Sequence, residues 1–165
     1  MRRVLAVFGS LLFLVLAPGI VAGLVPRWIT RWRFEPFRLA YLPVQIVGGM
    51  LVAAGVLVLL DSFARFAIRG LGTPAPVFPT RHLIINGLYR YARNPMYLAV
   101  LSVIVGQGLL FENSGLFAYG ALVWLAFHLF VVFYEEPTLR RQFGAEYEAY
   151  TVAVPRWLPR IRRRR

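Results

Sequence analysis

The sequence predicts an all-α, polytopic integral membrane protein with about four transmembrane helices followed by an amphipathic cytoplasmic helix. Of its 165 residues, 59% are hydrophobic and the mean hydropathy is +0.62, whereas soluble domains are about 45–50% apolar. A helix needs about 17–25 largely apolar residues to cross a bilayer. Four runs meet this criterion: residues 4–25, 39–60, 95–111 and 114–134.

The first run, 4–25, carries no charge and follows Arg2 and Arg3. A cleaved signal peptide is the alternative for this run, although it is longer than the usual apolar region of such peptides. The segment after it, PRWITRWRFEPFR, is rich in Arg and Trp. We predict that this segment lies on the membrane surface, because Arg and Trp favour the interface.

The second run, 39–60, leads into a long loop that is expected to be ordered. SFARFAIRGLG predicts a short interfacial helix ended by Gly70 or Gly72. Three prolines then favour a stiff, extended path, and Asn86 with Gly87 favours a turn. The faces of the interfacial helix are predicted to hold Phe63, Phe66 and Ala67 on one side and Arg65 and Arg69 on another.

The third run is expected to begin at Pro95, with Asn94 as its N-cap. Only Glu112 and Asn113 separate it from the fourth run, so these two helices should form a tight antiparallel hairpin. All 19 basic residues are arginine, against 7 acidic residues, and 15 of the arginines fall on the side that holds both termini in a four-span topology. This side is predicted to be cytoplasmic.

The stretch NGLYRYARNPMYLAV permits two interpretations. Arg90, Arg93 and the tyrosines could simply anchor and cap a membrane helix. The free N–H groups of a helix start beside two guanidinium groups could also bind a carboxylate or phosphate. Residues elsewhere in the chain are needed to distinguish a membrane anchor from a binding site.

Glu135 and Glu136 end the fourth run, where acidic side chains oppose the helix dipole. They therefore need a positive partner, which is either a local salt bridge to Arg140 or Arg141 or a cationic ligand. His128 lies on the same helical face as Glu135 and is either a functional intramembrane group or a packing residue.

Beyond Pro137 an amphipathic helix is predicted, with Leu139, Phe143, Tyr147 and Tyr150 at spacings of four, four and three. This stripe is typical of packing, and a lid over a site is the alternative. The tail PRWLPRIRRRR is expected to bind anionic lipid headgroups, and no nucleic-acid partner is expected.

Two blocks of the sequence, GLYRYARNPMY and EEPTLRRQFGAEYEAYTVAVPRWLP, resemble the isoprenylcysteine carboxyl methyltransferase family and the related phospholipid N-methyltransferases. The resemblance covers Thr80 to Pro159, the core of a single 1–165 membrane methyltransferase domain. It implies an integral membrane enzyme, in a bacterial or archaeal cell membrane, that binds S-adenosylmethionine at the cytoplasmic face of its carboxy-terminal helices without a metal ion.

The resemblance also assigns residues position by position. The signature Arg-His-Pro-x-Tyr is similar to residues 93–97, with Asn94 where many members have His, and the catalytic candidates are Arg90, Arg93 and His128. A Gly-x-Gly corresponds to Gly106 and Gly108, which helix packing would also explain. The implied cofactor-binding residues are Arg81, His82, Leu83, Ile84, Tyr89, Asn94, Pro95, Met96, Tyr97, Gly106, Gly108, Glu135 and Glu136.

The methyl acceptor is expected to be lipophilic, and a carboxylate of the isoprenylcysteine type is the first hypothesis. Eukaryotic relatives carry a substrate-contacting arginine where this chain has Val131. A phospholipid amine is therefore the alternative acceptor. Two alternatives belong to other functional classes. The protein could be a membrane reductase that uses NAD(P)H, or a non-catalytic protein that binds membrane lipids.

Overall fold

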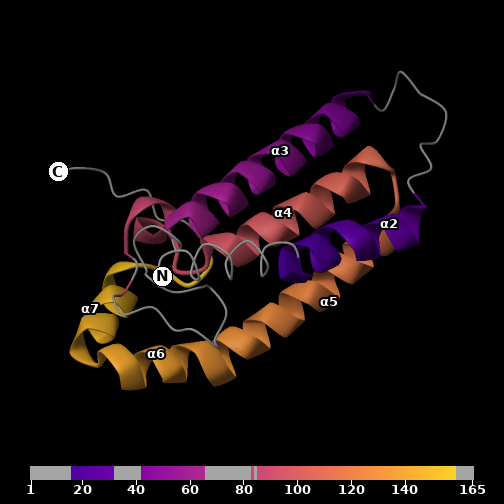
Figure 1. Cartoon of the computed structure of the whole chain (residues 1–165). Coiled ribbons are helices and arrows are strands. Elements are labelled where there is room, and N and C mark those ends of the chain that lie inside the picture. Colours follow the sequence, from indigo (N-terminus) through magenta and orange to yellow (C-terminus); the bar gives the residue numbers. More distant parts are fainter. Residues whose placement is uncertain (1–15, 32–41, 66–82, 84, 159–165) are drawn as a thin grey trace, which may run out of the picture.

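The computed structural model describes residues 16–31, 42–65, 83 and 85–158, and within these ranges the chain is helical and forms no strand (Figure 1). The all-α prediction is confirmed. A first helix, Leu16–Thr30, contains a π-helical turn and a short α-helix. The elements are η1 (Ile20–Leu24), α2 (Val25–Thr30), α3 (Leu42–Arg65), η4 (Gly87–Arg90), α4 (Pro95–Leu110), α5 (Ser114–Phe130), η5 (Val131–Glu135), α6 (Glu136–Phe143) and α7 (Ala145–Ala153).

Within the described residues, two helices are long and apolar enough to cross a bilayer: α3 and the continuous helix Ser114–Phe143. Only 17% and 22% of their most apolar windows are buried inside the protein. Core helices of soluble proteins are mostly buried, so these exposed apolar surfaces are suited to lipid rather than to water. The described apolar helix Leu16–Thr30 and helix α4 are shorter, and the predicted number of four spans stays a prediction.

The sequence placed two helix ends too early. The first helix continues through Pro26 to Thr30, so this part of the predicted surface segment is helical. Helix α3 continues to Arg65, because Arg65 donates to Asp61 one turn earlier at 2.6 and 2.7 Å and the two charges offset each other. Phe63 therefore belongs to α3, where it is buried. The remaining residues of the predicted interfacial helix, Phe66, Ala67, Arg69, Gly70 and Gly72, lie outside the described residues.

Helices α3 and α4 approach each other closely through glycines. A Cβ atom on Gly106 would lie 2.6 Å from the carbonyl oxygen of Gly48, and one on Gly48 would lie 2.7 Å from the carbonyl oxygen of Gly106. Further along the same crossing, a Cβ atom on Gly55 would lie 2.7 Å from the carbonyl oxygen of Ala99. Small residues let backbones meet in a membrane, so this crossing fixes the start of α4 against α3.

Replacing Gly106 by alanine should lower the free energy of unfolding by about 2 kcal/mol, because the added methyl group overpacks the α3–α4 crossing. The matched control is Gly49→Ala, since nothing lies within 4 Å of a Cβ atom at that position. Denaturant unfolding in detergent micelles measures both. Equal stability of the two variants would show that the crossing is not tightly packed.

The first helix docks on α4 and α5 through carbonyl groups that its own backbone leaves free. Pro26 has no N–H to give to Ala22, and the N–H of Val25 bonds to Ile20 in the π-helical turn. Side chains from the other helices take over: Gln107 Nε2 donates to the Ala22 carbonyl at 2.7 Å, and the Tyr119 hydroxyl donates to the Val21 carbonyl at 2.9 Å. The two carbonyl groups left free around Pro26 therefore bind the first helix to α4 and to α5.

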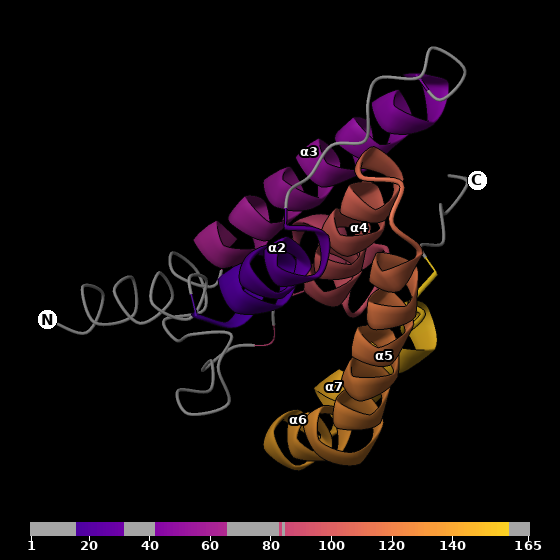
Figure 2. The ribbon, with the colours of Figure 1, turned by 90° about the vertical axis from the view of Figure 1, so that its right-hand side faces the viewer.

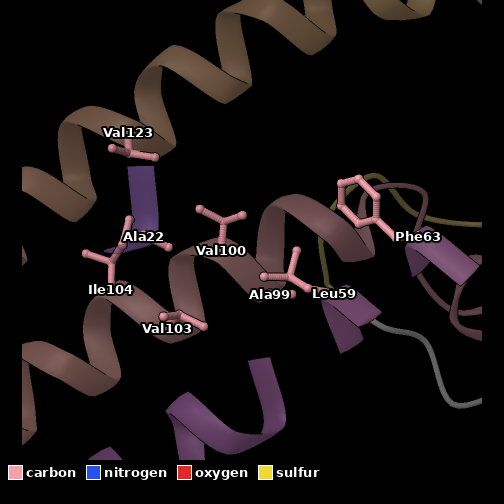
Figure 3. Close-up of a cluster of buried hydrophobic side chains, with 8 residues drawn as sticks. All are labelled: Ala22, Leu59, Phe63, Ala99, Val100, Val103, Ile104 and Val123. Atoms are coloured by element: carbon pink, nitrogen blue, oxygen red, sulfur yellow. The ribbon is translucent and has the colours of Figure 1, made fainter. Parts of the chain in front are cut away.

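A hydrophobic core runs through the middle of this bundle, with α4 at its centre (Figure 3). Ile104 of α4 is fully buried and faces Ala22 of the first helix and Val123 of α5. The other buried members are Leu59, Phe63, Ala99, Val100 and Val103. Helix α4 is therefore held on several sides, and its first turn has a fixed position.

The predicted hairpin between the third and fourth runs is confirmed, since α4 ends at Leu110 and α5 begins at Ser114. The predicted break near Pro137 is wrong. The helix continues through η5 and α6 to Phe143, and the chain turns at Gly144, where φ is +51°. Figures 1 and 2 show α6 and α7 gathered at the end of the bundle where α4 begins, which we call the α7 end.

Candidate functional site

A buried ion network lies at the α7 end and is centred on Glu136. Its carboxylate accepts a hydrogen bond from Arg93 Nη1 at 2.9 Å and two from Arg156, at 2.6 Å from Nε and 2.9 Å from Nη2. The side chain of Glu136 is 7% exposed, that of Arg93 12% and that of Arg156 32%. One carboxylate thus joins the segment before α4, the start of α6 and the segment after α7. These hydrogen bonds raise the pKa of Arg156, which stays charged.

Arg93 is held from several sides but keeps one donor unused. Its backbone N–H donates to the Pro155 carbonyl at 2.9 Å, and its Nη1 also reaches the Tyr147 hydroxyl at 3.4 Å. Its Nε is buried without an acceptor within the described part of the chain. A buried donor without a partner is costly, so this atom can take an acceptor beyond those that the described residues provide.

Asn94 does not act as the predicted side-chain cap. Helix α4 begins at Pro95 as expected, and the backbone carbonyl of Asn94 accepts from the Leu98 N–H at 3.2 Å. The amide Nδ2 instead donates to the Arg156 carbonyl at 3.1 Å. The side chain of this buried residue therefore ties the helix start to the carboxy-terminal segment, which competes with capping for the same group.

Glu135 faces a different partner from Glu136. Its Oε2 accepts a hydrogen bond from the Tyr97 hydroxyl at 2.9 Å. Neighbouring residues in a helix point about 100° apart, which is why one glutamate reaches α4 and the other reaches the two arginines. The Tyr97 ring lies 4.6 Å from Phe127 and 6.5 Å from Trp157, centroid to centroid. The Tyr97–Glu135 pair is thus enclosed by aromatic rings.

The local salt bridges considered for the two glutamates do not form. Arg140 pairs with Glu148 at 3.0 Å on the protein surface, and Arg141 Nη2 lies 3.4 Å from Thr138 Oγ1. Both glutamates were expected on the same face as Arg90, Arg93 and Asn94; Glu136 contacts Arg93, whereas Glu135 contacts Tyr97. The acidic pair therefore belongs to the α7 end of the bundle rather than to its own helix.

His128 has a packing environment. The indole N–H of Trp157 donates to His128 Nδ1 at 3.3 Å, and Trp124 stacks on the imidazole with centroids 5.3 Å apart. Its catalytic role stays a prediction, and the contacts favour the packing interpretation.

The aromatic stripe predicted after Pro137 packs against itself and against Leu83. Tyr147 and Tyr150 of α7 are buried, and burial raises the pKa of both, so they remain protonated donors. The Tyr150 hydroxyl donates to the Tyr89 carbonyl at 2.6 Å. The stripe is thus the core that joins α6 and α7 to the segment before α4.

A cavity of about 710 Å³ lies beside this core, between residues 83–91 and α7. Leu83 and Tyr150 line it together with Arg90 and Glu146. Arg90 is exposed and does not join the Glu136 network. The predicted cofactor residues Arg81, His82 and Ile84 lie outside the described residues.

The other predicted cofactor residues separate into two groups. Pro95 and Met96 lie in the first turn of α4, where Pro95 is buried and Met96 packs on the core. Gly106 and Gly108 lie about 16 Å or more further along α4, at about 1.5 Å per residue. Gly106 packs on α3, and Gly108 lies against Phe117 of α5. This placement supports the packing interpretation, and the cofactor contact expected for the two glycines stays a prediction.

Arg156 and Trp157 are site residues that the sequence analysis assigned to lipid headgroups. The structure places Arg156 on Glu136 and Trp157 between Tyr97 and His128. Pro155 and Pro159, which flank Arg-Trp-Leu in the sequence, are the available signal, because paired prolines fix an extended path rather than a loose tail.

Comparison with known proteins agrees with this geometry. A family model described as phospholipid methyltransferase matches residues 44–146, which is more than half of the chain. The match contains the Arg93–Tyr97 segment and both glutamates, and it begins within α3. No curated protein and no solved structure matches the chain. The chain therefore belongs to the phospholipid methyltransferase family.

Proposed function

We propose that the protein transfers a methyl group from S-adenosylmethionine to an amine headgroup of a membrane phospholipid. The observation that carries the proposal is the pairing, at one end of an apolar helical bundle, of a buried Arg93 donor without an acceptor and the Tyr97–Glu135 pair. The family match supports the reaction class, and the exposed apolar faces of α3 and α5 support an acceptor that resides in the membrane.

The residues at the α7 end fit the groups of this cofactor. Its carboxylate requires a cationic donor, which Arg93 Nε supplies, and its ammonium group requires a carboxylate, which Glu135 supplies. Phe127 and Trp157 lie against the Tyr97 ring, whose hydroxyl contacts Glu135, and this aromatic surface would help to exclude water from the reacting atoms. The bound cofactor supplies a methyl group on a sulfonium, so transfer needs no metal ion.

The adenosine end of the cofactor is proposed to occupy the cavity beside α7. Leu83 and Tyr150 offer an apolar and aromatic wall, and the Glu146 carboxylate offers an acceptor for ribose hydroxyl groups. The Arg93 N–H to Pro155 hydrogen bond connects this cavity to the Glu136 network, because Pro155 also lines the cavity. Tyr89, carried over from the resemblance, holds Tyr150 through its carbonyl.

An amine acceptor fits the described residues better than the isoprenylcysteine carboxylate that the sequence favoured first. Val131, at the position of the substrate-contacting arginine of eukaryotic relatives, is 1% exposed. Arg156 is engaged by Glu136, and the unpaired Nε of Arg93 is assigned to the cofactor carboxylate, so neither arginine is left to hold an acceptor carboxylate. An amine acceptor needs no such cationic partner and instead loses a proton during methyl transfer.

A transfer assay with radiolabelled methyl cofactor tests this proposal. The purified protein is expected to label phosphatidylethanolamine in mixed micelles and to leave a farnesylcysteine analogue unlabelled. Labelling of the farnesylcysteine analogue alone would overturn the amine acceptor and keep methyl transfer. Binding of NADPH without binding of S-adenosylmethionine would overturn the reaction class in favour of a reductase, and binding of neither would favour a non-catalytic lipid-binding protein.

A further inference from the structure

A second cavity at the α7 end is apolar and lies between α3 and the start of α4. Its volume is about 560 Å³, and its walls include Ala54 and Val58 of α3 and Leu98 of α4. Leu88 and Tyr91 of the preceding segment close one end. Most of the residues that line it are apolar, so this groove accepts a hydrocarbon chain rather than a polar ligand.

The groove continues into a polar basin of about 510 Å³. Leu88 and Tyr91 line both, and the basin adds the side chains of Asp61, Arg65 and Arg90. Arg65 is paired with Asp61, so that pair adds no net charge. Arg90 is exposed and makes no ion pair within the described part of the chain. The basin therefore carries a net positive charge next to an apolar groove.

The groove is separate from the Tyr97–Glu135 pair of the proposed cofactor site, although Tyr91 lines both the groove and the cavity beside α7 and Arg90 lines both the basin and that cavity. It lies on the side of α4 that faces α3, where Leu98 and Ser102 are found, and the Ser102 hydroxyl donates to the Leu51 carbonyl of α3 at 2.9 Å. Tyr97 faces the other way, toward Phe127 and Glu135 on the helix that begins with α5. A chain in the groove would thus have α4 between itself and the Tyr97–Glu135 pair.

We propose that this groove binds one anionic phospholipid of the bilayer, with an acyl chain between α3 and α4 and its phosphate beside Arg90. The charge of Arg90 next to an apolar groove selects this occupant, because an anionic phospholipid has both complementary parts. The bound lipid would fill the space between α3 and α4 without being the methyl acceptor. Arg90, which the sequence placed among the catalytic candidates, is here a lipid-binding residue.

Binding of spin-labelled phosphatidylglycerol to the full-length protein in phosphatidylcholine nanodiscs tests the proposal. Ala54→Phe, which fills the groove, should reduce the motionally restricted lipid at least fivefold. The matched control is Ala53→Phe on the neighbouring exposed position of α3, which does not line the groove. The control should change the signal less than twofold.

Arg90→Gln provides a second test that does not depend on packing, because Arg90 is exposed. It should weaken phosphatidylglycerol binding about fivefold and should abolish the preference over spin-labelled phosphatidylcholine, whereas Arg141→Gln should do neither. Equal binding of both lipids by the wild-type protein, or unchanged binding by both Ala54→Phe and Arg90→Gln, would overturn the proposal. The assay contains no cofactor, so its failure would leave the proposed methyl transfer untouched.

Discussion

Replacing Glu136 by alanine is expected to lower the free energy of unfolding by about 3 kcal/mol, because removal of one member of a buried ion network leaves the other charges unpaired. The unpaired charge of Arg93 contributes most to this loss of stability, since its side chain is only 12% exposed. Arg156 is 32% exposed and remains partly solvated, which keeps the expected loss at the lower end of the range for buried pairs.

The matched control for this change is Glu148→Ala, which removes the carboxylate of the exposed Arg140–Glu148 pair. Exposed pairs contribute little, so the control should lose no more than about 0.5 kcal/mol. Chemical unfolding followed by tryptophan fluorescence measures both variants, because Trp157 reports on the α7 end. If both variants lost the same free energy, Glu136 would not organise this end of the protein.

Replacing Glu135 by glutamine is expected to weaken S-adenosylmethionine binding about tenfold or more, because a hydrogen bond to a charged group contributes about 1.5–3 kcal/mol. Glutamine keeps the size of the side chain and can still accept from the Tyr97 hydroxyl, so the change removes charge and little else. The free energy of unfolding should stay close to that of the wild-type protein.

Equilibrium dialysis with labelled cofactor measures this effect, and thermal unfolding of the same samples shows that the fold is kept. Glu148→Gln, at the exposed glutamate of α7, serves as the control and should bind as the wild-type protein does. Tyr97→Phe should weaken binding less than Glu135→Gln, since it leaves the carboxylate in place. Unchanged affinity in Glu135→Gln would remove the acidic pair from the cofactor site.

Helix boundaries that are set by residues adjacent in the sequence were predicted correctly. Asn94-Pro95 predicted the start of α4, and Glu112-Asn113 predicted the hairpin before α5. The ends of the first helix and α3 were placed too early. Pro26 and Asp61 look like terminators in the sequence, but Pro26 is accommodated by a π-helical turn and by Gln107 of another helix, and Asp61 is paired with Arg65.

Part of the candidate site could be predicted from the charges of the two glutamates. Glu135 and Glu136 indicated the need for a positive group, although the partners expected were Arg140, Arg141 or a cationic ligand, and the structure instead pairs Glu136 with Arg93. The identity of the second partner, Arg156, was not predictable, because it depends on how the segment after α7 returns to α4. Gly106 and Gly108 pack closely against α3 and Phe117, and the cofactor contact that the motif pattern predicted for them stays a prediction.

Photolabelling with radiolabelled S-adenosylmethionine tests most directly the claim that the cofactor binds at the Glu136 network. Ultraviolet irradiation of the purified protein in micelles, followed by peptide mapping, identifies the labelled segments. The proposed site predicts label in peptides that contain Arg93–Tyr97 or the segment from Glu135 to Trp157, with suppression by excess S-adenosylhomocysteine. Label confined to α3 or to the first helix, or label that excess S-adenosylhomocysteine does not suppress, would contradict it.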